Sequence, residues 1–128
     1  MKTEFADFAA TQDARNTIQL KVREHCLTLC DRLLENFKSR NYGKVGRHNA
    51  PEYKFYIAEG GRKYHKLIME TDSGSRSVHA FVDKKSGEVY KAASWKAPAK
   101  IVRYNLLEIA SREECFSRAD WAGGYLYL

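Results

Sequence analysis

The sequence is poor in cysteine and lacks any long apolar run, and each shortage excludes a class of protein. Three cysteines in 128 residues are an odd number, which argues against a disulfide framework. We expect Cys26, Cys30 and Cys115 to be reduced and mostly buried as small hydrophobic side chains. No window approaches the ~20 apolar residues of a membrane-spanning helix, and Met1–Ala10 lacks the apolar stretch of a signal peptide. We therefore expect one cytoplasmic domain, residues 1–128, with no membrane partner.

Signatures of a catalytic or metal centre are also missing. The sequence has no nucleophile elbow, no paired carboxylates and no glycine-rich phosphate loop, and it lacks the aromatic motif of RNA-recognition domains. His25, Cys26 and Cys30 lie close together, but zinc sites usually need four converging ligands, and both cysteines fall on an apolar helix face. We predict no metal and no cofactor, and enzyme activity has no support.

The charge that is present is uneven. The formal net charge is +6, but the segment Lys38–Arg103 has fifteen Lys and Arg against six Asp and Glu, a net charge of +9. Part of this charge lies in Asn41–Pro51, a polar connection that we expect to be a mobile basic loop. A positive field in the middle of the chain can attract phosphates, although a surface kept charged for solubility would look the same.

Apolar residues recur at steps of three and four from about Thr11 to Ser39, which predicts one long amphipathic helix. Its apolar face consists of Ile18, Val22, Cys26, Leu29, Cys30, Leu33 and Phe37. Thr11 or Asp13 can cap its start, and Gly43 is a stop signal. We expect this helix to lie across a sheet.

Four strand-like runs follow, separated by short turns: Tyr53–Glu59, Arg62–Glu70, Ser77–Asp83 and Glu88–Ala92. They predict an antiparallel meander. Pro98 can open a short helix from Ala99 to Tyr104, and Ser111 with Glu114 forms a capping box for another over Ser111–Ala119. The fold class is therefore α+β: a long N-terminal helix on a four-stranded antiparallel meander, followed by one or two short helices. The tail Trp121–Leu128 fits an edge strand, a core plug or an oligomer contact.

A two-residue turn at Gly60–Gly61 would pair Ile57 with Tyr64, and this register sorts the strands into two faces. The aliphatic face is predicted to be the core and comprises Tyr56, Leu67, Met69, Val78, Ala80, Val82 and Val89. The other face is aromatic and comprises Tyr53, Phe55, Ile57, Tyr64, Lys66, Ile68, His79, Phe81 and Tyr90. It can be a platform on which bases stack, or it can be covered by the C-terminal segments or another subunit.

Aromatic and cationic residues alternate in Ser77–Asn105, which contains almost no acid after Glu88. Trp95 can stack on a base while nearby cations meet phosphate, or it can pin its loop to the core. The candidate ligand-binding residues are Trp95, Lys91, Lys96, Lys100, Arg103, Asn105, Lys66 and His79. Asn105 is equally suited to cap a helix, with Glu108 completing a capping box.

The stretch Ser77–Leu106 resembles a segment of small, mostly uncharacterised accessory proteins of tailed bacteriophages, through HAFVD, SGEVYKAASWKAPAK and RYN. The resemblance covers about a quarter of the chain and implies a phage or prophage origin and a role in the cytoplasm of the infected host. It implies no catalytic residue.

From these features we predict a non-catalytic protein that binds a phosphate-bearing partner, nucleic acid first, through a basic aromatic surface. Two alternatives stay open. One is an oligomeric anti-defence protein that sequesters a nucleotide signal in pockets between subunits. The other is a structural or host-protein-binding module that uses the tail or the aromatic face as its interface.

Overall fold

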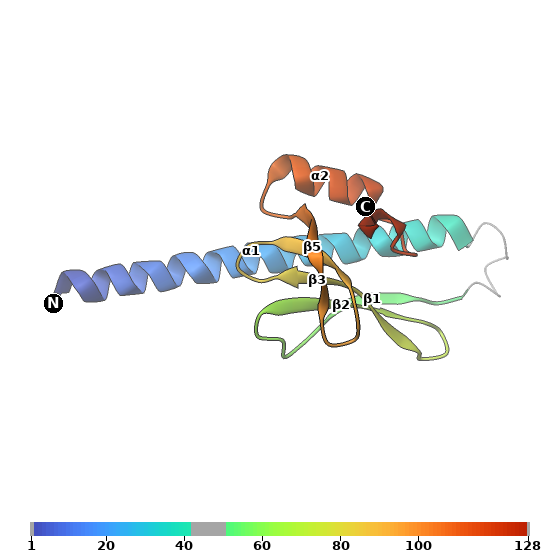
Figure 1. Ribbon diagram of the computed structural model, residues 1–128, viewed down its shortest axis with the longest axis horizontal. Coiled ribbons are helices and arrows are strands. Elements are labelled where there is room, and N and C mark those ends of the chain that lie inside the picture. Colours follow the sequence, from blue (N-terminus) through green and yellow to red (C-terminus); the bar gives the residue numbers. More distant parts are fainter. Residues whose placement is uncertain (1, 42–50, 128) are drawn as a thin grey trace.

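The computed structural model describes residues 2–41 and 51–127 of the chain. It is an α+β fold in which one long helix lies along a five-stranded antiparallel sheet, with a second, short helix beside the last strand (Figure 1). The elements are α1 (Lys2–Asn41), β1 (Lys54–Ala58), β2 (Tyr64–Glu70), β3 (Arg76–Asp83), β4 (Glu88–Ala92), β5 (Pro98–Asn105) and α2 (Ile109–Arg118). The sheet order is β1-β2-β3-β4-β5, which confirms a meander. The expected basic loop at residues 42–50 lies outside the described residues.

Helix α1 is longer than its apolar pattern predicts, because it begins at Lys2 rather than near Thr11. At a rise of about 1.5 Å per residue it spans about 60 Å, and its N-terminal part extends well past the sheet (Figure 1). The predicted face is buried from Val22 to Phe37, but Ile18 is 40% exposed because it lies near the projecting part. The period therefore predicted the packed segment correctly, whereas the predicted caps Thr11 and Asp13 lie inside the helix.

The fifth strand, β5, occupies the segment for which the sequence predicts a short helix over Ala99–Tyr104, so that prediction is wrong. Pro98 opens an edge strand, a position that tolerates a missing backbone N–H as well as the first turn of a helix does. Ile101 and Val102 are β-branched and favour extended backbone, and β5 pairs with β4. Pro98 is compatible with the start of a helix and with an edge strand, and the pairing of β5 with β4 decides for the strand.

The predicted register of the first hairpin is also wrong. Ile57 pairs with Leu67, not Tyr64, because the connection runs from Glu59 to Lys63 rather than through two glycines alone. Gly60 in this connection has φ +97, which favours glycine. The shift of three residues moves Ile57 and Phe55 to the core side and Tyr56 to the other side.

A bulge moves His79 to a different face from the one predicted. The pairing of β2 with β3 shifts between Leu67, which faces Ala80, and Ile68, which faces Val78. His79 is the extra residue. It therefore lies on the side of α1, where its Nε2 is 2.8 Å from the hydroxyl of Tyr125. His65, which pairs with the core residue Val82, lies on the same face as His79.

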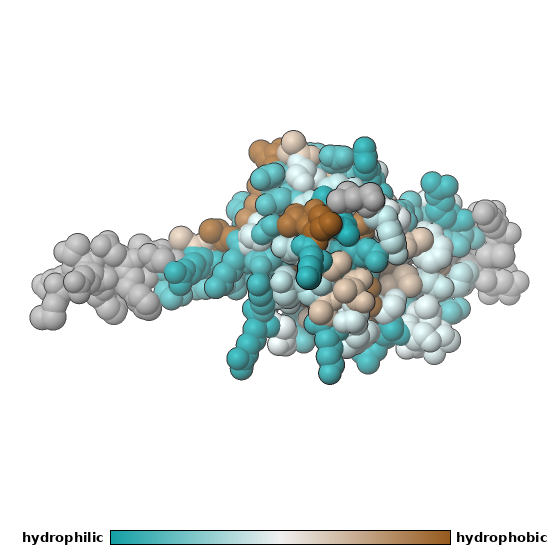
Figure 2. Space-filling model, viewed as in Figure 1, coloured by the Kyte–Doolittle hydropathy of each residue, from teal (hydrophilic) through white to brown (hydrophobic). Residues whose placement is uncertain are grey.

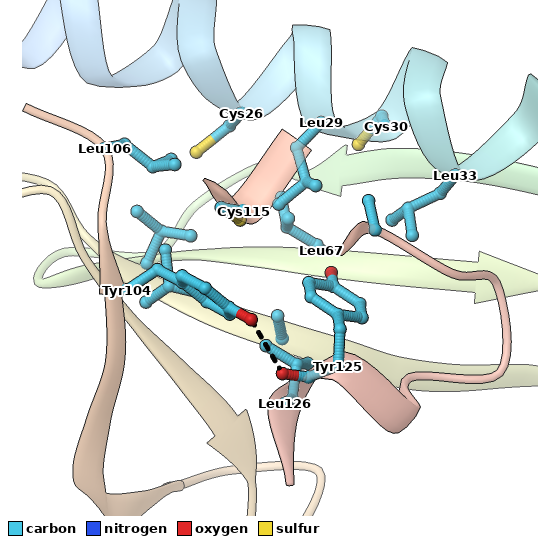
Figure 3. Close-up of a cluster of buried hydrophobic side chains, with 14 of the residues drawn as sticks. Cys26, Leu29, Cys30, Leu33, Leu67, Tyr104, Leu106, Cys115, Tyr125 and Leu126 are labelled. Carbon is cyan, nitrogen blue, oxygen red and sulfur yellow. Dashed lines mark hydrogen bonds between the residues drawn. The ribbon is translucent and has the colours of Figure 1, made fainter. Parts of the chain in front are cut away.

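The core lies between α1, the sheet and the C-terminal segments (Figure 3). Leu29 and Leu33 of α1 point toward Leu67 of the sheet, and the hydroxyl of Tyr104 donates to the carbonyl oxygen of Tyr125 at 3.1 Å. The three cysteines are free and buried in this core, as predicted, and burial raises the pKa of the Cys30 and Cys115 thiols to about 12. The aliphatic sheet residues Leu67, Ala80, Val82 and Val89 are part of it, as predicted.

The C-terminal segments close the other side of this core. Helix α2 begins at Ile109, so Ser111 is not its cap; the Ser111 hydroxyl instead accepts the backbone N–H of Asn105 at 2.8 Å. The end of the chain forms a short 3-10 helix (Gly124–Leu126), and Tyr125 and Leu126 are buried. The sequence left three possibilities for the tail: an edge strand, a core plug or an oligomer contact. Tyr125 and Leu126 behave as a core plug.

Candidate nucleic-acid interface

Trp95 sits in a tight turn between β4 and β5. The Ser94 hydroxyl accepts the backbone N–H groups of Lys96 and Ala97 at 3.3 and 3.2 Å. The Ala97 carbonyl oxygen in turn accepts the N–H groups of Ala93 and Ser94. A serine that binds the backbone just ahead of it stabilises such a turn. These bonds fix the position of Trp95, whose side chain is 44% exposed.

The Trp95 turn lies over the sheet face that points away from α1. Phe81 and Ile68 on this face are buried although they lie outside the main core. Lys66 Nζ lies 4.9 Å from the centre of the Trp95 ring and 5.7 Å from that of Phe81. Arg76 is the second cation at the tryptophan, with Cζ 5.8 Å from its centre. Lys66 thus joins the sheet to the turn, and this face is covered in part by the protein's own turn.

A cleft of about 490 Å³ opens between this turn and the connection from β1 to β2. We call it the Trp95 cleft. Its lining residues are Ala58, Glu59, Gly60, Gly61, Arg62, Lys63, Tyr64, Lys66, Phe81, Trp95 and Lys96. Its size falls within the roughly 300–1,000 Å³ of small-ligand sites. Figure 2 shows long hydrophilic side chains projecting from the lower side of the body, where Figure 1 places this turn.

The charge of the Trp95 cleft is strongly positive. Four of its lining residues are cations, and Glu59 is the one acid. That acid is already paired, because an oxygen of Glu59 lies 2.7 Å from Arg23 on α1. The hydrogen bond and the charge of Arg23 lower the pKa of Glu59. Among the described lining residues the four cations therefore meet no unpaired carboxylate, and an anion there meets a favourable field.

A second cleft, of about 290 Å³, continues the basic surface toward α1. It shares Arg62 and Lys63 with the first and adds Lys84 and Lys85. The ammonium of Lys84 donates to the carbonyl oxygen of Gly61, which ties the two turns together. Asp83 is occupied in its own turn, where Oδ1 accepts the N–H groups of Lys85 and Ser86. The two clefts form one cationic track with the aromatic rings at one end.

The structure brings three of the predicted site residues together, namely Trp95, Lys66 and Lys96. Lys91 and Arg103 lie elsewhere, against the C-terminal tail: Lys91 Nζ is 4.5 Å from the Tyr127 ring centre, and Arg103 Nε donates to the carbonyl oxygen of Leu126 at 2.5 Å. Lys100 is exposed on β5 and does not line the cleft.

The remaining two predicted residues have structural roles. Asn105 Oδ1 accepts the N–H of Leu107 at 2.9 Å, in the turn that leads to α2. His79 is packed between Phe55 and Tyr125, and burial lowers its pKa to about 4. Neither residue reaches the Trp95 cleft.

Sequence reasoning missed Arg62, Lys63 and Arg76. Arg62 and Lys63 directly follow the glycine pair of the first hairpin, and Arg76 ends the TDSGSR turn. Cations at turn tips were the available signal, since connecting segments carry binding residues more often than the elements that they join. The prediction instead concentrated on one continuous stretch of sequence.

Fold and cleft together define a class: an α+β protein with a cationic, partly aromatic cleft on the sheet face opposite its long helix. No helix within the described residues is both long and apolar enough to cross a membrane. The chain belongs to the family of unknown function DUF7717, whose sequence profile matches residues 5–128. No curated protein and no solved structure matches it.

Proposed function

We propose that the protein binds single-stranded nucleic acid in the Trp95 cleft without catalysing a reaction on it. The observation that carries this proposal is the pairing of a 44% exposed tryptophan with cations from three different segments around one cleft. Stacking on an aromatic ring together with a basic groove is the usual chemistry of single-strand binding.

The geometry favours single strands over duplexes. Trp95 can stack only on a base whose face is free, and bases inside a duplex are already stacked. The cationic track that passes Arg62 and Lys63 toward Lys84 and Lys85 would follow the phosphates of the same strand. The origin of the protein in a tailed phage, and its role in the infected cell, stay predictions from the sequence.

Fluorescence anisotropy with labelled single-stranded DNA, single-stranded RNA and duplex DNA tests this proposal. The single strands should bind more tightly than the duplex. Trp95→Leu keeps an apolar side chain over the sheet but removes the ring, so affinity should fall by the ~1–3 kcal/mol of one stacked base, about 5- to 150-fold. Unchanged affinity in this variant, with the fold intact by circular dichroism, would refute the proposal. Tight binding of a mononucleotide in place of a strand would favour the nucleotide-sequestering alternative.

A further inference from the structure

Another cavity, of about 330 Å³ and separate from both basic clefts, lies on the opposite side of the sheet from the Trp95 cleft. Strands β3 and β4 form its floor and the C-terminal tail its wall. We call it the tail cavity. Its lining residues are Met69, Ser77, Val78, His79, Lys91, Ala92, Trp121, Ala122, Gly123, Leu126 and Tyr127. It shares no residue with the Trp95 cleft, so what it binds does not follow from the proposed function.

Lys91 is the one charged residue of this lining. Its ammonium lies over the Tyr127 ring, 4.5 Å from the centre, and no carboxylate within the described residues forms an ion pair with it. Asp120 directly precedes the lining residue Trp121, but its two carboxylate oxygens accept the N–H groups of Gly124 and Tyr125 at 3.1 and 2.9 Å. The described lining therefore holds one cation, Lys91, and no carboxylate, although the charge of Asp120 reaches His79 from behind the lining.

His79 supplies a second polar group. The buried hydroxyl of Tyr125 has His79 Nε2 as its one hydrogen-bond partner within the described residues. We assign the phenol as the donor, because a buried O–H with a single partner is satisfied only in that direction, and this assignment places the imidazole proton on Nδ1. His65 Nε2 is the sole buried side-chain nitrogen or oxygen without a partner in the described part of the chain. His79 Nδ1 has no partner among the described residues either, and because it is not one of the fully buried unpaired atoms, it is open to the cavity that His79 lines, where it would be a donor.

The cavity is built in advance of any ligand. The carbonyl oxygen of Asp120 accepts the N–H of Gly123, and its carboxylate holds the next two amides. Asn36 of α1 accepts the N–H of Trp121 at 3.0 Å. Gly123, at φ +84, lies beside the Nδ1 edge of His79, where a Cβ would come within 4.0 Å of Nδ1. These bonds fix the aromatic walls, so a ligand would not have to order them.

We propose that the tail cavity is a binding site for a small organic anion that carries a flat ring and one negative charge. The ring packs between the apolar walls, near Trp121 and Leu126, and the anionic group accepts hydrogen bonds from Lys91 and His79. Ser77, which also lines the cavity, supplies a third donor. A lining with three donors, one of them charged, and no carboxylate selects an anion over a neutral or cationic ligand of the same shape.

Benzoate and benzamide form a matched pair of probes, because they share a ring and a similar shape and differ in charge. Titration of the full-length protein labelled with ¹⁵N should shift the amide signals of Ser77, Lys91 and Gly123 with benzoate, and the shifts should saturate. Benzamide should bind about tenfold or more weakly, since it lacks the charge-assisted hydrogen bonds. Lys91→Met should weaken benzoate to the level of benzamide, and Ser77→Ala should weaken it by less.

Lys85→Met is the control, since it removes the same charge from the cationic track on another part of the surface and should leave benzoate binding unchanged. Trp95→Leu should likewise leave benzoate binding unchanged, and Lys91→Met should leave nucleic-acid binding unchanged, so the two proposals fail separately. Equal affinity for benzoate and benzamide, benzoate shifts at the Trp95 cleft, or no shift at the highest soluble concentration would each overturn the tail-cavity proposal.

Discussion

Replacing Lys96 by Met probes the Trp95 cleft through the salt dependence of nucleic-acid binding. Each phosphate that a cation neutralises on a single strand adds about −0.7 to the slope of log affinity against log salt. The cleft presents four cations, Arg62, Lys63, Lys66 and Lys96. If each meets one phosphate, these four cations contribute about −2.8 to the slope, which by itself lowers affinity about 50-fold between 50 and 200 mM salt.

Lys96→Met leaves three of these cations. The slope should become about 0.7 less negative, so the contribution of the cleft falls to about −2.1, which is a loss of affinity of about 20-fold over the same salt range. Lys100→Met is the matched control, because Lys100 is also an exposed lysine of the β4–β5 hairpin but does not line the cleft. Its slope should stay at the wild-type value.

Anisotropy titrations of the three proteins at several salt concentrations give the slopes directly. Two results would refute the reasoning. If the two variants lose the same amount of slope, binding follows net charge rather than the cleft. If Lys96→Met keeps the wild-type slope while the chain still binds, Lys96 does not contact a phosphate.

Three further predictions concern the fold. Burial lowers the pKa of His65 and His79 to about 4. Because the folded state favours the neutral form of both side chains, the free energy of unfolding decreases as pH falls from about 6.5 toward 4. The expected loss is about 2 kcal/mol per histidine between pH 7 and pH 5. Urea unfolding at both pH values measures this loss, and His65→Leu should remove about half of it; an unchanged pH dependence in that variant would contradict the assignment. The cysteines, buried and with raised thiol pKa values, should react with a thiol reagent only after denaturation, and fast labelling of the native protein would show that the core opens readily. Truncation before Gly124 removes two buried side chains worth about 1.5–3 kcal/mol each, so the midpoint of urea unfolding should fall sharply; an unchanged midpoint would mean that the tail does not plug the core.

Local patterns were enough for the elements that depend on one segment of chain. The buried face of α1 from Val22 to Phe37 follows from a 3.6-residue period, and the first four strands of the meander follow from short runs between turn residues. The helix start and β5 were missed for a shared reason. Their signals, a capping residue and Pro98, each suit more than one backbone conformation, and for Pro98 the pairing of β5 with β4 decides.

The candidate site shows the same limit. Trp95 and Lys96 were identified from an aromatic and basic stretch, and the structure places them at a cleft. Lys91 and Arg103 come from the same stretch but point to the tail, because strands that alternate two faces separate neighbours in sequence. His79 was misplaced because a bulge, which no residue pattern announced, adds one residue to β3.

The sequence by itself determined the fold class, the packed segment of α1, the burial of the cysteines and the concentration of positive charge in the middle of the chain. These depend on periodicity and composition, which are properties of neighbouring residues. Only the tertiary structure decided the register of the sheet, the face on which each cation lies, and the fact that Arg62 and Lys63 join Trp95 in one cleft. Such contacts join residues more than thirty positions apart, and they exist only because turn length and a bulge set how the strands align.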